Sequence, residues 1–351
     1  MSQPLLVTGT IGIDTILTPS GRADGVLGGS VSFAAVAALL FADRVDAVSI
    51  IGEDFPAHYE AALEAKGVCM NGVERKKGPS FSWTGEYFDN MNKRRTVCAN
   101  DSVMLEWDVH VPEPLRNHPV LVCCCMVPAQ QLKCMEQCPD AALVLSDSMD
   151  KWLRRQPELL DAVISRSHIT MMNEDEAKEY AQASTVLEAG EFLLSKGAAY
   201  AVVKQGEYGA TLLGRDVGGN LRMFRCPAYP LKTLVDPTGA GDTFLGALAG
   251  ELSTLPPGLP PFEEVKKGIV YGTVAASFTC ESFSADALLS MTKETFRRRL
   301  EEYAEMCRLP DIRLFSARYS DVWIRSPDKE EIATLISLSF LRFCGMSGMF
   351  R

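Results

Sequence analysis

Residues 236–244, which read DPTGAGDTF, combine a short glycine-rich turn with the start of an apolar helix. Small residues at Gly239, Ala240 and Gly241 let successive backbone N–H groups point outward at the positive end of the helix dipole. That arrangement attracts a phosphate and stabilises the charge that develops during its transfer. Asp242 lies in the same turn and can accept a proton from an attacking hydroxyl. The stretch therefore predicts a phosphoryl-transfer site.

Outside this turn, apolar strands alternate with helices. Strands are expected at residues 5–9, 45–51, 120–125, 142–146, 169–172, 200–204, 210–213 and 222–226, and helices at 31–42, 56–66, 129–137, 157–165, 175–182, 185–196 and 243–252. Alternation at this spacing indicates an α/β fold with a central, mostly parallel sheet flanked by helices. Helical sequence continues to about residue 308, and no internal repeat is visible.

One segment interrupts the alternation. Phe81, Trp83 and Tyr87 fall two or four residues apart, and residues 89–93 (DNMNK) are typical of a hairpin turn. We interpret the segment as an antiparallel β excursion that forms a lid, with an inert surface hairpin as the alternative. The expected boundaries are 15–27 and 76–101 for the lid, 1–308 for the whole domain, and 309–351 for a C-terminal tail of unknown role.

The composition is that of a globular protein, because 47% of the 351 residues are hydrophobic and 23% are charged. The formal net charge is −10 and Lys and Arg form no long run, so nucleic acid is not expected as a partner. The first residues lack the basic and apolar regions of a signal peptide. Residues 332–350 are fairly apolar but contain Arg342, so no membrane span is expected.

Eleven cysteines raise the question of disulfides or a metal site. Cys123, Cys124 and Cys125 are consecutive in an apolar strand, where neighbouring side chains point to opposite faces. Cys134 and Cys138 have helical spacing with no histidine nearby, so a zinc site is not expected. Reduced thiols in the cytoplasm are the interpretation that fits this pattern.

The string VDPTGAGDTFLGAL at residues 235–248 resembles the C-terminal signature of the ribokinase-like (PfkB) carbohydrate kinases. In that family the aspartate at the position of Asp242 is the catalytic base, and the turn at Gly239, Ala240 and Gly241 stabilises the transferring group. The resemblance also implies the family's fold, a central mostly parallel sheet flanked by helices with a small β lid. The motif GxxxxGK[ST] is absent and no GxGxxG follows the first strand, so neither a P-loop kinase nor a dinucleotide-dependent dehydrogenase is expected.

Two further segments match the family on the acceptor side. Gly28 and Gly29 precede a helix and resemble the N-terminal signature, in which glycines let the backbone approach the substrate. Asp14 follows the first strand, where the family places a carboxylate that binds sugar hydroxyls. The resemblance thus implies substrate binding by these three residues.

Two segments match on the nucleotide side. Asn173 and Glu176 form the family's NxxE pattern, which organises Mg²⁺ and the triphosphate, with Glu176 acting on the metal indirectly. Residues 204–209 (KQGEYG) resemble the strand-to-turn segment along ATP. The residues that the resemblance places at the nucleotide are Asn173, Glu176, Lys204, Gly206, Gly209, Thr238 and Gly241. Taken alone, the first segment also fits an acidic helix N-terminus and the second a plain turn.

The match fails at positions that concern the acceptor. Many members carry an Asn soon after the Gly-Gly pair, where Ser32 is the nearest polar residue here, and a polar residue near the strand end that holds Cys125. A less polar pocket suits a nucleoside base or a modified sugar as well as a free pentose. From the lid, Asn92 and one of Arg94 and Arg95, with Arg95 as the candidate, are expected at the substrate, or both arginines are solvated.

We therefore expect a kinase that transfers the γ-phosphate of ATP to a hydroxymethyl group of a sugar or sugar-like molecule. ATP and Mg²⁺ are the expected cofactors, and a monovalent cation such as K⁺ is left open. The alternatives are a nucleoside kinase of the adenosine-kinase type, a nucleotide- or sugar-binding descendant without catalysis, and a scaffold whose tail binds a partner. A homodimer through the lid is an expectation from the family alone.

Overall fold

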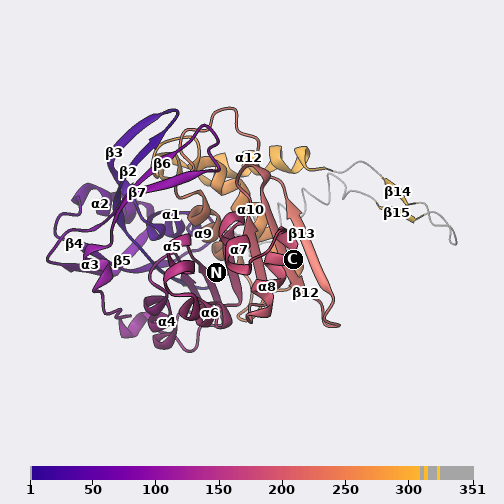
Figure 1. Ribbon diagram of the computed structural model, residues 1–351, viewed down its shortest axis with the longest axis horizontal. Coiled ribbons are helices and arrows are strands. Elements are labelled where there is room, and N and C mark those ends of the chain that lie inside the picture. Colours follow the sequence, from indigo (N-terminus) through magenta and orange to yellow (C-terminus); the bar gives the residue numbers. More distant parts are fainter. Residues whose placement is uncertain (1, 309–311, 315–321, 325–351) are drawn as a thin grey trace, which may run out of the picture. The chain divides into compact units, whose positions relative to one another are not determined.

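A nine-stranded sheet forms the centre of the computed structural model, which describes residues 2–308, 312–314 and 322–324 (Figure 1). In spatial order its strands are β13 (Leu221–Cys226), β12 (Ala210–Arg215), β11 (Tyr200–Lys204), β10 (Ile169–Asn173), β9 (Leu143–Asp147), β8 (Val120–Cys123), β1 (Leu5–Thr8), β4 (Val45–Gly52) and β5 (Val68–Lys76). From β11 to β5 all neighbouring pairs are parallel, whereas β12 and β13 are antiparallel. The predicted α/β fold with a mostly parallel sheet is confirmed.

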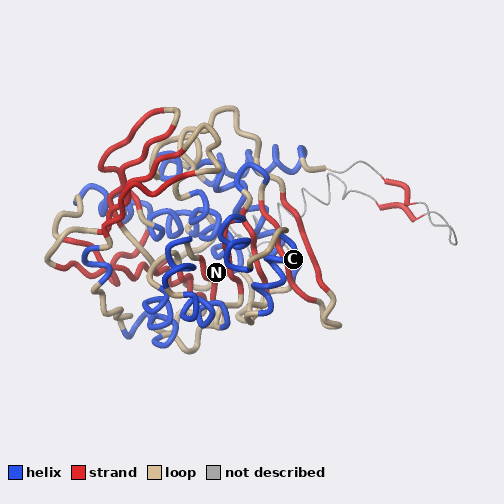
Figure 2. The backbone as a smooth tube through the Cα atoms, viewed as in Figure 1, coloured by secondary structure: helices blue, strands red, loops and turns tan. Residues whose placement is uncertain are grey.

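Helices flank this sheet (Figure 2). On one side α1, α9 and α10 pack against one another, and on the other α4, α6, α7 and α8 supply the apolar side chains of two buried clusters. The helices are α1 (Ser30–Ala38), α2 (Ala57–Lys66), α3 (Ser102–Leu105), α4 (Pro128–Gln137), α5 (Asp150–Arg155), α6 (Pro157–Ser165), α7 (Glu174–Ala181), α8 (Val186–Ser195), α9 (Ala240–Leu252), α10 (Phe262–Thr279) and α11 (Asp286–Ser290), with 3₁₀ turns η1 (Glu113–Leu115) and η2 (Gly206–Tyr208). Because each parallel crossover needs such a helix, this arrangement follows from the strand–helix alternation.

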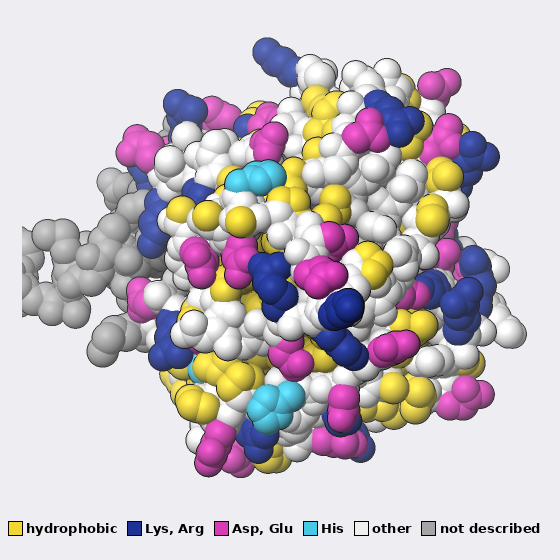
Figure 3. All heavy atoms as spheres, turned by 90° about the vertical axis from the view of Figure 1, so that its left-hand side faces the viewer, with side chains coloured by type: hydrophobic (Ala, Val, Ile, Leu, Met, Phe, Trp, Pro, Cys, Tyr) yellow, Lys and Arg dark blue, Asp and Glu magenta, His cyan; other side chains and the backbone are white. Residues whose placement is uncertain are grey.

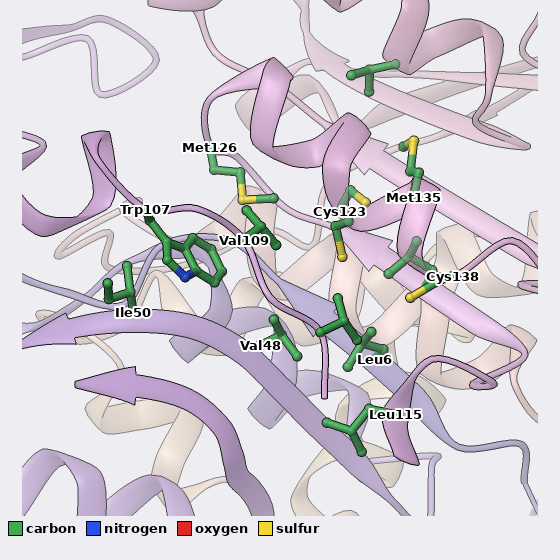
Figure 4. Close-up of a cluster of buried hydrophobic side chains, with 14 of the residues drawn as sticks. Leu6, Val48, Ile50, Trp107, Val109, Leu115, Cys123, Met126, Met135 and Cys138 are labelled. Atoms are coloured by element: carbon green, nitrogen blue, oxygen red, sulfur yellow. The ribbon is translucent and has the colours of Figure 1, made fainter. Parts of the chain in front are cut away.

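One of the two clusters fills the space between the sheet and α4 (Figure 4). Leu6 of β1, Val48 of β4 and Cys123 of β8 are completely buried, and Met135 of α4 and Cys138, the residue after α4, belong to the same cluster. Alternate strand residues point to one face, which is why every second residue joins this cluster. The cysteines here are free and packed among apolar side chains. A fully buried leucine of this kind contributes about 1.5–3 kcal/mol.

A second sheet has the order β3-β2-β6-β7 (Figure 1). Its strands are β2 (Gly12–Thr18), β3 (Gly21–Gly28), β6 (Phe81–Tyr87) and β7 (Arg94–Asn100). Strands β6 and β7 form the predicted antiparallel hairpin, and the Phe88 N–H donates to the Lys93 carbonyl at its tip (3.2 Å). Strand β2 pairs with β3 antiparallel and with β6 parallel, so two segments distant in sequence build one small sheet, called the lid below.

The compact unit that contains both of these sheets is Ser2–Phe296. Helix α12 (Lys293–Met306) begins before the end of this unit at Phe296 and continues beyond it. The domain boundary expected from the end of helical sequence therefore falls later, at residue 308. Beyond it, β14 (Ile312–Leu314) pairs antiparallel with β15 (Val322–Ile324), and the rest of the expected tail lies outside the described residues. Within the described ranges, no helix has the length and apolar character needed to cross a bilayer.

Charges of both signs mix on the surface. Figure 3 shows Lys and Arg side chains beside Asp and Glu across the face that it displays. Ion pairs of this kind include Arg75 with Glu60 (2.5 Å) and Arg22 with Asp24 (2.6 Å). Such a surface differs from the basic stripe of nucleic-acid-binding proteins, in line with the net charge.

An ionic cluster around a buried carboxyl lies near the start of β4, with Arg44 at the surface and His118 buried. Asp46 is completely buried, and its Oδ2 lies 2.8 Å from His118 Nε2 and accepts a hydrogen bond from Arg44 Nε at 2.7 Å. Burial by itself raises the pKa of this carboxyl, but hydrogen bonds from His118, Arg44 and Cys69 outweigh burial and hold the pKa well below its usual range. The folded protein therefore favours the ionised carboxylate.

We expect Asp46→Asn to lower the free energy of unfolding by about 3 kcal/mol at neutral pH, because it breaks an ionic cluster around a buried carboxyl. A depressed folded-state pKa stabilises the protein above the unfolded-state pKa of about 4, and this stabilisation is lost as the pH falls. Urea unfolding should thus show a smaller difference between variant and wild type at about pH 3. Asp24→Asn, in the exposed pair, is the control, and an equal difference for Asp46→Asn at both pH values contradicts the prediction.

Candidate active site

Polar side chains from neighbouring strands meet at one edge of the large sheet. Strand β9 ends at Asp147, β10 at Asn173 and β11 at Lys204, and the β10–β11 register places Asn173 beside Lys204. At the end of β8 the chain continues with Cys124 and Cys125. Because the carboxyl ends of parallel strands lie at the same edge, residues far apart in sequence come together here, the usual place for ligands in such sheets.

The predicted glycine-rich turn leads into α9. Asp236 is buried and anchors the turn, since its Oδ1 accepts the Thr238 N–H at 2.8 Å. Gly239 has a φ of 77°, and a Cβ at this position would lie 2.4 Å from the Phe33 ring, so the turn requires glycine here. Helix α9 begins at Ala240, and the first amides of a helix have no acceptor within it. The Ala240 N–H donates to the Pro237 carbonyl at 3.2 Å, so the neighbouring amides of the turn are the candidate donors to an anion.

Asp242 lies in the first turn of α9, close to the strand ends. Burial raises its pKa to about 7, the nearby carboxyl of Asp147 adds to this, and Lys204 opposes it. A carboxyl group with a pKa near neutral can take a proton from a hydroxyl and release it again at physiological pH. Its environment therefore suits a general base.

The ammonium of Lys204 forms an ion pair with Asp147 Oδ2, and both side chains are largely buried. It also lies beside the turn, because a Cβ on Gly241 would come within 3.0 Å of its Nζ. Burial lowers the pKa of Lys204, but Asp147, Glu176 and Asp242 raise it above its ordinary value. The lysine is therefore charged. Asp147 was not predicted as a site residue, although its position directly after the expected strand 142–146 was an available signal.

Asn173 and Glu176 form a capping box at the start of α7. The Glu176 N–H donates to Asn173 Oδ1 (2.8 Å), and the Asn173 N–H donates to Glu176 Oε2 (3.2 Å). The NxxE residues therefore also form an ordinary acidic helix N-terminus, so the two interpretations of this segment do not exclude each other. Burial raises the pKa of Glu176 to about 7, and the charge of Lys204 opposes this. The capping box fixes Glu176 near the lysine.

On the lid, Asp14 of β2 packs against the glycines that precede α1. A Cβ on Gly28 would lie 2.1 Å from the Asp14 carboxyl, and Gly29 has a φ of 88°, so both positions require glycine. Burial raises the pKa of Asp14 to about 8, and Asp236 and Asp242 add to this. Among the described residues, no group hydrogen-bonds to its buried Oδ1. A buried oxygen without a donor marks a place for a ligand hydroxyl.

The structure does not bring Ser32 or Arg95 to this site. The Ser32 hydroxyl is buried inside α1 and donates to the Gly28 carbonyl at 2.8 Å, the preceding turn of the chain. Arg95 is exposed and pairs with Glu86 on the lid itself at 2.5 Å. Both side chains thus have local partners, and the expectation that they contact substrate has no support in the geometry.

Arg94 takes the orientation that was expected of Arg95. Its guanidinium lies 5.5 Å from the centre of the Trp83 ring, and its charge lowers the pKa of both Glu176 and Asp242. Adjacent residues of a strand point to opposite faces, so only one of the two arginines can face the site. The alternation of side chains along the strand could have indicated which of the two arginines shares a face of the lid with Trp83, and the sequence analysis did not use it.

The tip of the lid contacts the nucleotide-side loops. Asn92 Nδ2 donates to Glu207 Oε1 (2.7 Å), and its Oδ1 accepts the Glu207 N–H (3.2 Å). Gly206 has a φ of 56°, and a Cβ there would collide with Asn92 Oδ1 at 2.1 Å. Lys93 pairs with Asp175 at 2.6 Å. Asn92 therefore holds the KQGEYG turn, whereas the sequence analysis expected it at the substrate.

Two more expected nucleotide residues lie at turns. Gly209 has a φ of 94°, and a Cβ there would lie 1.9 Å from the Cys226 carbonyl. Only glycine can therefore occupy this position. The Thr238 hydroxyl donates to the Tyr87 hydroxyl of β6 at 3.1 Å. The second contact ties the lid to the glycine-rich turn.

A family model described as pfkB family carbohydrate kinase matches residues 22–291. The chain belongs to this family. It is therefore a phosphotransferase that uses ATP and an alcohol group of a sugar or nucleoside as acceptor, and the resemblance seen in the sequence is confirmed.

A cytidine kinase from Thermococcus kodakarensis is 29% identical over 270 residues, which cover 76% of this chain and 93% of that protein. Among solved structures, the nucleoside kinase of Burkholderia thailandensis in complex with inosine has a TM-score of 0.69 at 18% identity, covering 85% of this chain and 97% of that one. The ribokinase of Arabidopsis thaliana complexed with ribose and ATP has a TM-score of 0.67 at 18% identity, covering 86% and 99%. Both structures share the fold of this pfkB-family chain.

If Asp242 is the base, Asp242→Asn should lower kcat by about 10³-fold with little change in the KM for ATP. The carboxyl acts when unprotonated, so wild-type kcat/KM should rise with pH up to about 7 and then level off. Acceptor-dependent ADP release across pH 5–9 measures both effects. Asp216→Asn, in the distant turn after β12, is the control. A variant that keeps a tenth of wild-type kcat would rule out this role.

Proposed function

We propose that the chain transfers the γ-phosphoryl group of Mg²⁺-bound ATP to the hydroxymethyl group of a ribose-containing acceptor. The observation that carries this is Asp242, a buried carboxyl with a pKa near 7 at the N-terminus of α9. The acceptor oxygen loses its proton to Asp242 and attacks the γ-phosphorus, while the bond from this phosphorus to ADP breaks. Backbone amides of the turn at Gly239 and Gly241 stabilise the charge on the phosphoryl oxygens, whereas the Ala240 N–H donates to the Pro237 carbonyl at 3.2 Å.

On the nucleotide side, Lys204 supplies a fixed positive charge to the phosphates, and Thr238, Gly206 and Gly209 shape the turns along ATP. Mg²⁺ neutralises charge on the triphosphate when bound. No group of three His, Cys, Asp or Glu side chains in the described part of the chain is placed to hold a metal ion. This supports a metal that arrives with ATP, with Glu176 acting on it through water, because Mg²⁺ keeps much of its hydration.

On the acceptor side, the buried Oδ1 of Asp14 accepts hydroxyl groups of the sugar, and the backbone at Gly28 and Gly29 lets the sugar approach closely. Burying this oxygen without a donor is costly unless a ligand supplies one. The charges of Asp236 and Asp242 act on Asp14, so the sugar lies close to the base. This favours an acceptor with adjacent hydroxyls near its reactive hydroxymethyl group.

A nucleoside is the second candidate acceptor, and the apolar wall of the site favours it. Cys124 and Cys125 stand at the end of β8, where many family members have a polar residue. Trp83 pairs with Asp14 in the β2–β6 register and is largely buried, so an aromatic side chain adjoins the sugar site. A nucleobase would pack against such surfaces. The similarity to a cytidine kinase supports the same class.

Arg94 is proposed as the lid cation that faces the acceptor or the transferring phosphoryl group. It stands over Trp83, and both Arg94 Nη1 (3.4 Å) and Trp83 Nε1 (3.1 Å) reach the Thr96 hydroxyl. Its neighbour Arg95 points away and pairs with Glu86. The two arginines therefore form a matched pair for a test of the lid.

Arg94→Met should lower kcat/KM by about 10²-fold, because it removes a cation that faces the site. Arg95→Met should change kcat/KM by less than about twofold, since it breaks only an exposed pair on the lid. Both values come from the same coupled ADP assay. Equal losses in the two variants would show that the lid matters as a whole and not through Arg94.

The acceptor class is tested by ADP release from Mg²⁺-ATP across pentoses, hexoses, inositols and nucleosides, with Asp242→Asn alongside. We expect turnover with ribose-containing molecules and at least about a 10-fold higher kcat/KM for one class, sugars or nucleosides. Running the assay in sodium and in potassium buffers decides whether K⁺ is needed. Turnover confined to acceptors without a ribose would overturn the assignment of Asp14.

A homodimer and a cytoplasmic location are also part of the proposal. Strand β7 is exposed along most of its length, which suits a homodimer formed through the lid. The buried thiols of Cys123, Cys134 and Cys138 suit a reducing compartment such as the cytoplasm.

A further inference from the structure

Asp147 belongs to none of the recognised motifs. Each of its three oxygen atoms has a hydrogen-bond or ion-pair partner. Its side chain is 4% exposed, Oδ1 accepts the Ser148 N–H at 2.9 Å, and Oδ2 pairs with Lys204. Its main-chain carbonyl accepts from Gln131 Nε2 at 2.9 Å, and the same amide group reaches the Cys124 carbonyl at 2.9 Å. Gln131 therefore fixes the ends of β8 and β9 without help from the Asp147 carboxylate. The carboxylate is left to hold the lysine.

Lys204, the partner of Asp147, lies next to the glycine-rich turn, the capping box and the proposed base. Lys204 is 17% exposed, and its Nζ lies against Gly241 of the glycine-rich turn. Glu176, of the capping box, and Asp242, the proposed base, both interact with its charge. A phosphoryl group that passes from ATP to an acceptor at Asp242 must pass close to this ammonium.

A lysine side chain is long and flexible, so its ammonium needs a fixed partner to stay in place. Without Asp147, the carboxylates of Glu176 and Asp242 still attract the lysine charge. An ion pair between Lys204 and Asp242 would draw the ammonium away from the phosphates and make the carboxylate a weaker base. Asp147 counters this competition because it is already paired with the ammonium.

We propose that Asp147 is a positioning residue that holds the Lys204 ammonium against the Gly241 turn, where it contacts the phosphoryl group in transfer and stays away from the base Asp242. The inference rests on the proposed kinase reaction. Lys204 keeps its proton throughout: the acceptor proton goes to Asp242, and the bond between the γ-phosphorus and ADP breaks as the new P–O bond forms. Lys204 supplies charge alone.

Asp147→Asn keeps the shape of the side chain and removes its charge. We expect kcat/KM for the acceptor to fall about 10–100-fold. Because neutralising one partner of a buried ion pair also lowers stability, kcat/KM is compared at a temperature at which both proteins are folded; Gln131 still holds the strand ends. Asp161→Asn is the matched control. Asp161 pairs with Lys196 at 2.8 Å between α6 and α8, and its loss should change kcat/KM by less than about twofold.

Two measurements separate positioning from a structural role. In a double-mutant cycle, Asp147→Asn combined with Lys204→Met should be no slower than Lys204→Met alone, because the carboxylate acts through the lysine. The acidic limb of the kcat/KM profile of Asp147→Asn should also move to lower pH. Asp147 raises the pKa of Asp242, and a released Lys204 would lower it further.

Wild-type kcat/KM in Asp147→Asn, additive losses in the cycle, or an unshifted acidic limb would each overturn the inference. Failure of the wild type to release ADP with any acceptor would instead refute the proposed function. In that case the rise in melting temperature on adding Mg²⁺-ATP tests whether Asp147 positions Lys204. Asp147→Asn and Lys204→Met should lose the same share of the ATP-induced rise in melting temperature, and a full rise in Asp147→Asn would contradict it.

Discussion

The ammonium of Lys204 lies among buried carboxyl groups that come from three different elements. Asp147 pairs with it directly, and Glu176 and Asp242 interact with its charge. Carboxylates are costly to bury, and one lysine offsets the cost only in part. The remainder is visible in the pKa values of about 7 for Glu176 and Asp242. This imbalance keeps the pKa of Asp242 near neutrality and favours a ligand that brings its own cation, as a nucleotide with bound Mg²⁺ does.

The sheet makes this concentration of charge possible. Parallel strands end at one edge, so β9, β10 and β11 place Asp147, Asn173 and Lys204 side by side. The lid adds groups from the other side, with Asn92 on the nucleotide turn and Tyr87 on Thr238. The lid therefore contacts both the KQGEYG turn and the glycine-rich turn. Closure over both ligands would exclude water from the phosphoryl group, which strengthens every charge interaction there.

Much of the site could be predicted because its signals are local. The glycine-rich turn needs glycine at Gly239 for its backbone conformation and an apolar helix after it, and both features are written in consecutive residues. The capping box at Asn173 and Glu176 is likewise a four-residue pattern. Failures occurred where a side chain's direction decides its role: Ser32 bonds inside its own helix, and Arg95 faces away from the site while Arg94 faces it.

By itself, the sequence determined the α/β class and the family, and it singled out the glycine-rich turn and Asp242 as the candidate base, since each depends on periodicity or on short contiguous motifs. The tertiary structure decided that Asp147 partners Lys204, that Asn92 contacts Glu207, and that Asp14 has a buried oxygen without a donor. These contacts join residues separated by tens to more than a hundred positions. Strand order and lid packing bring them together, and no local pattern of residues encodes either.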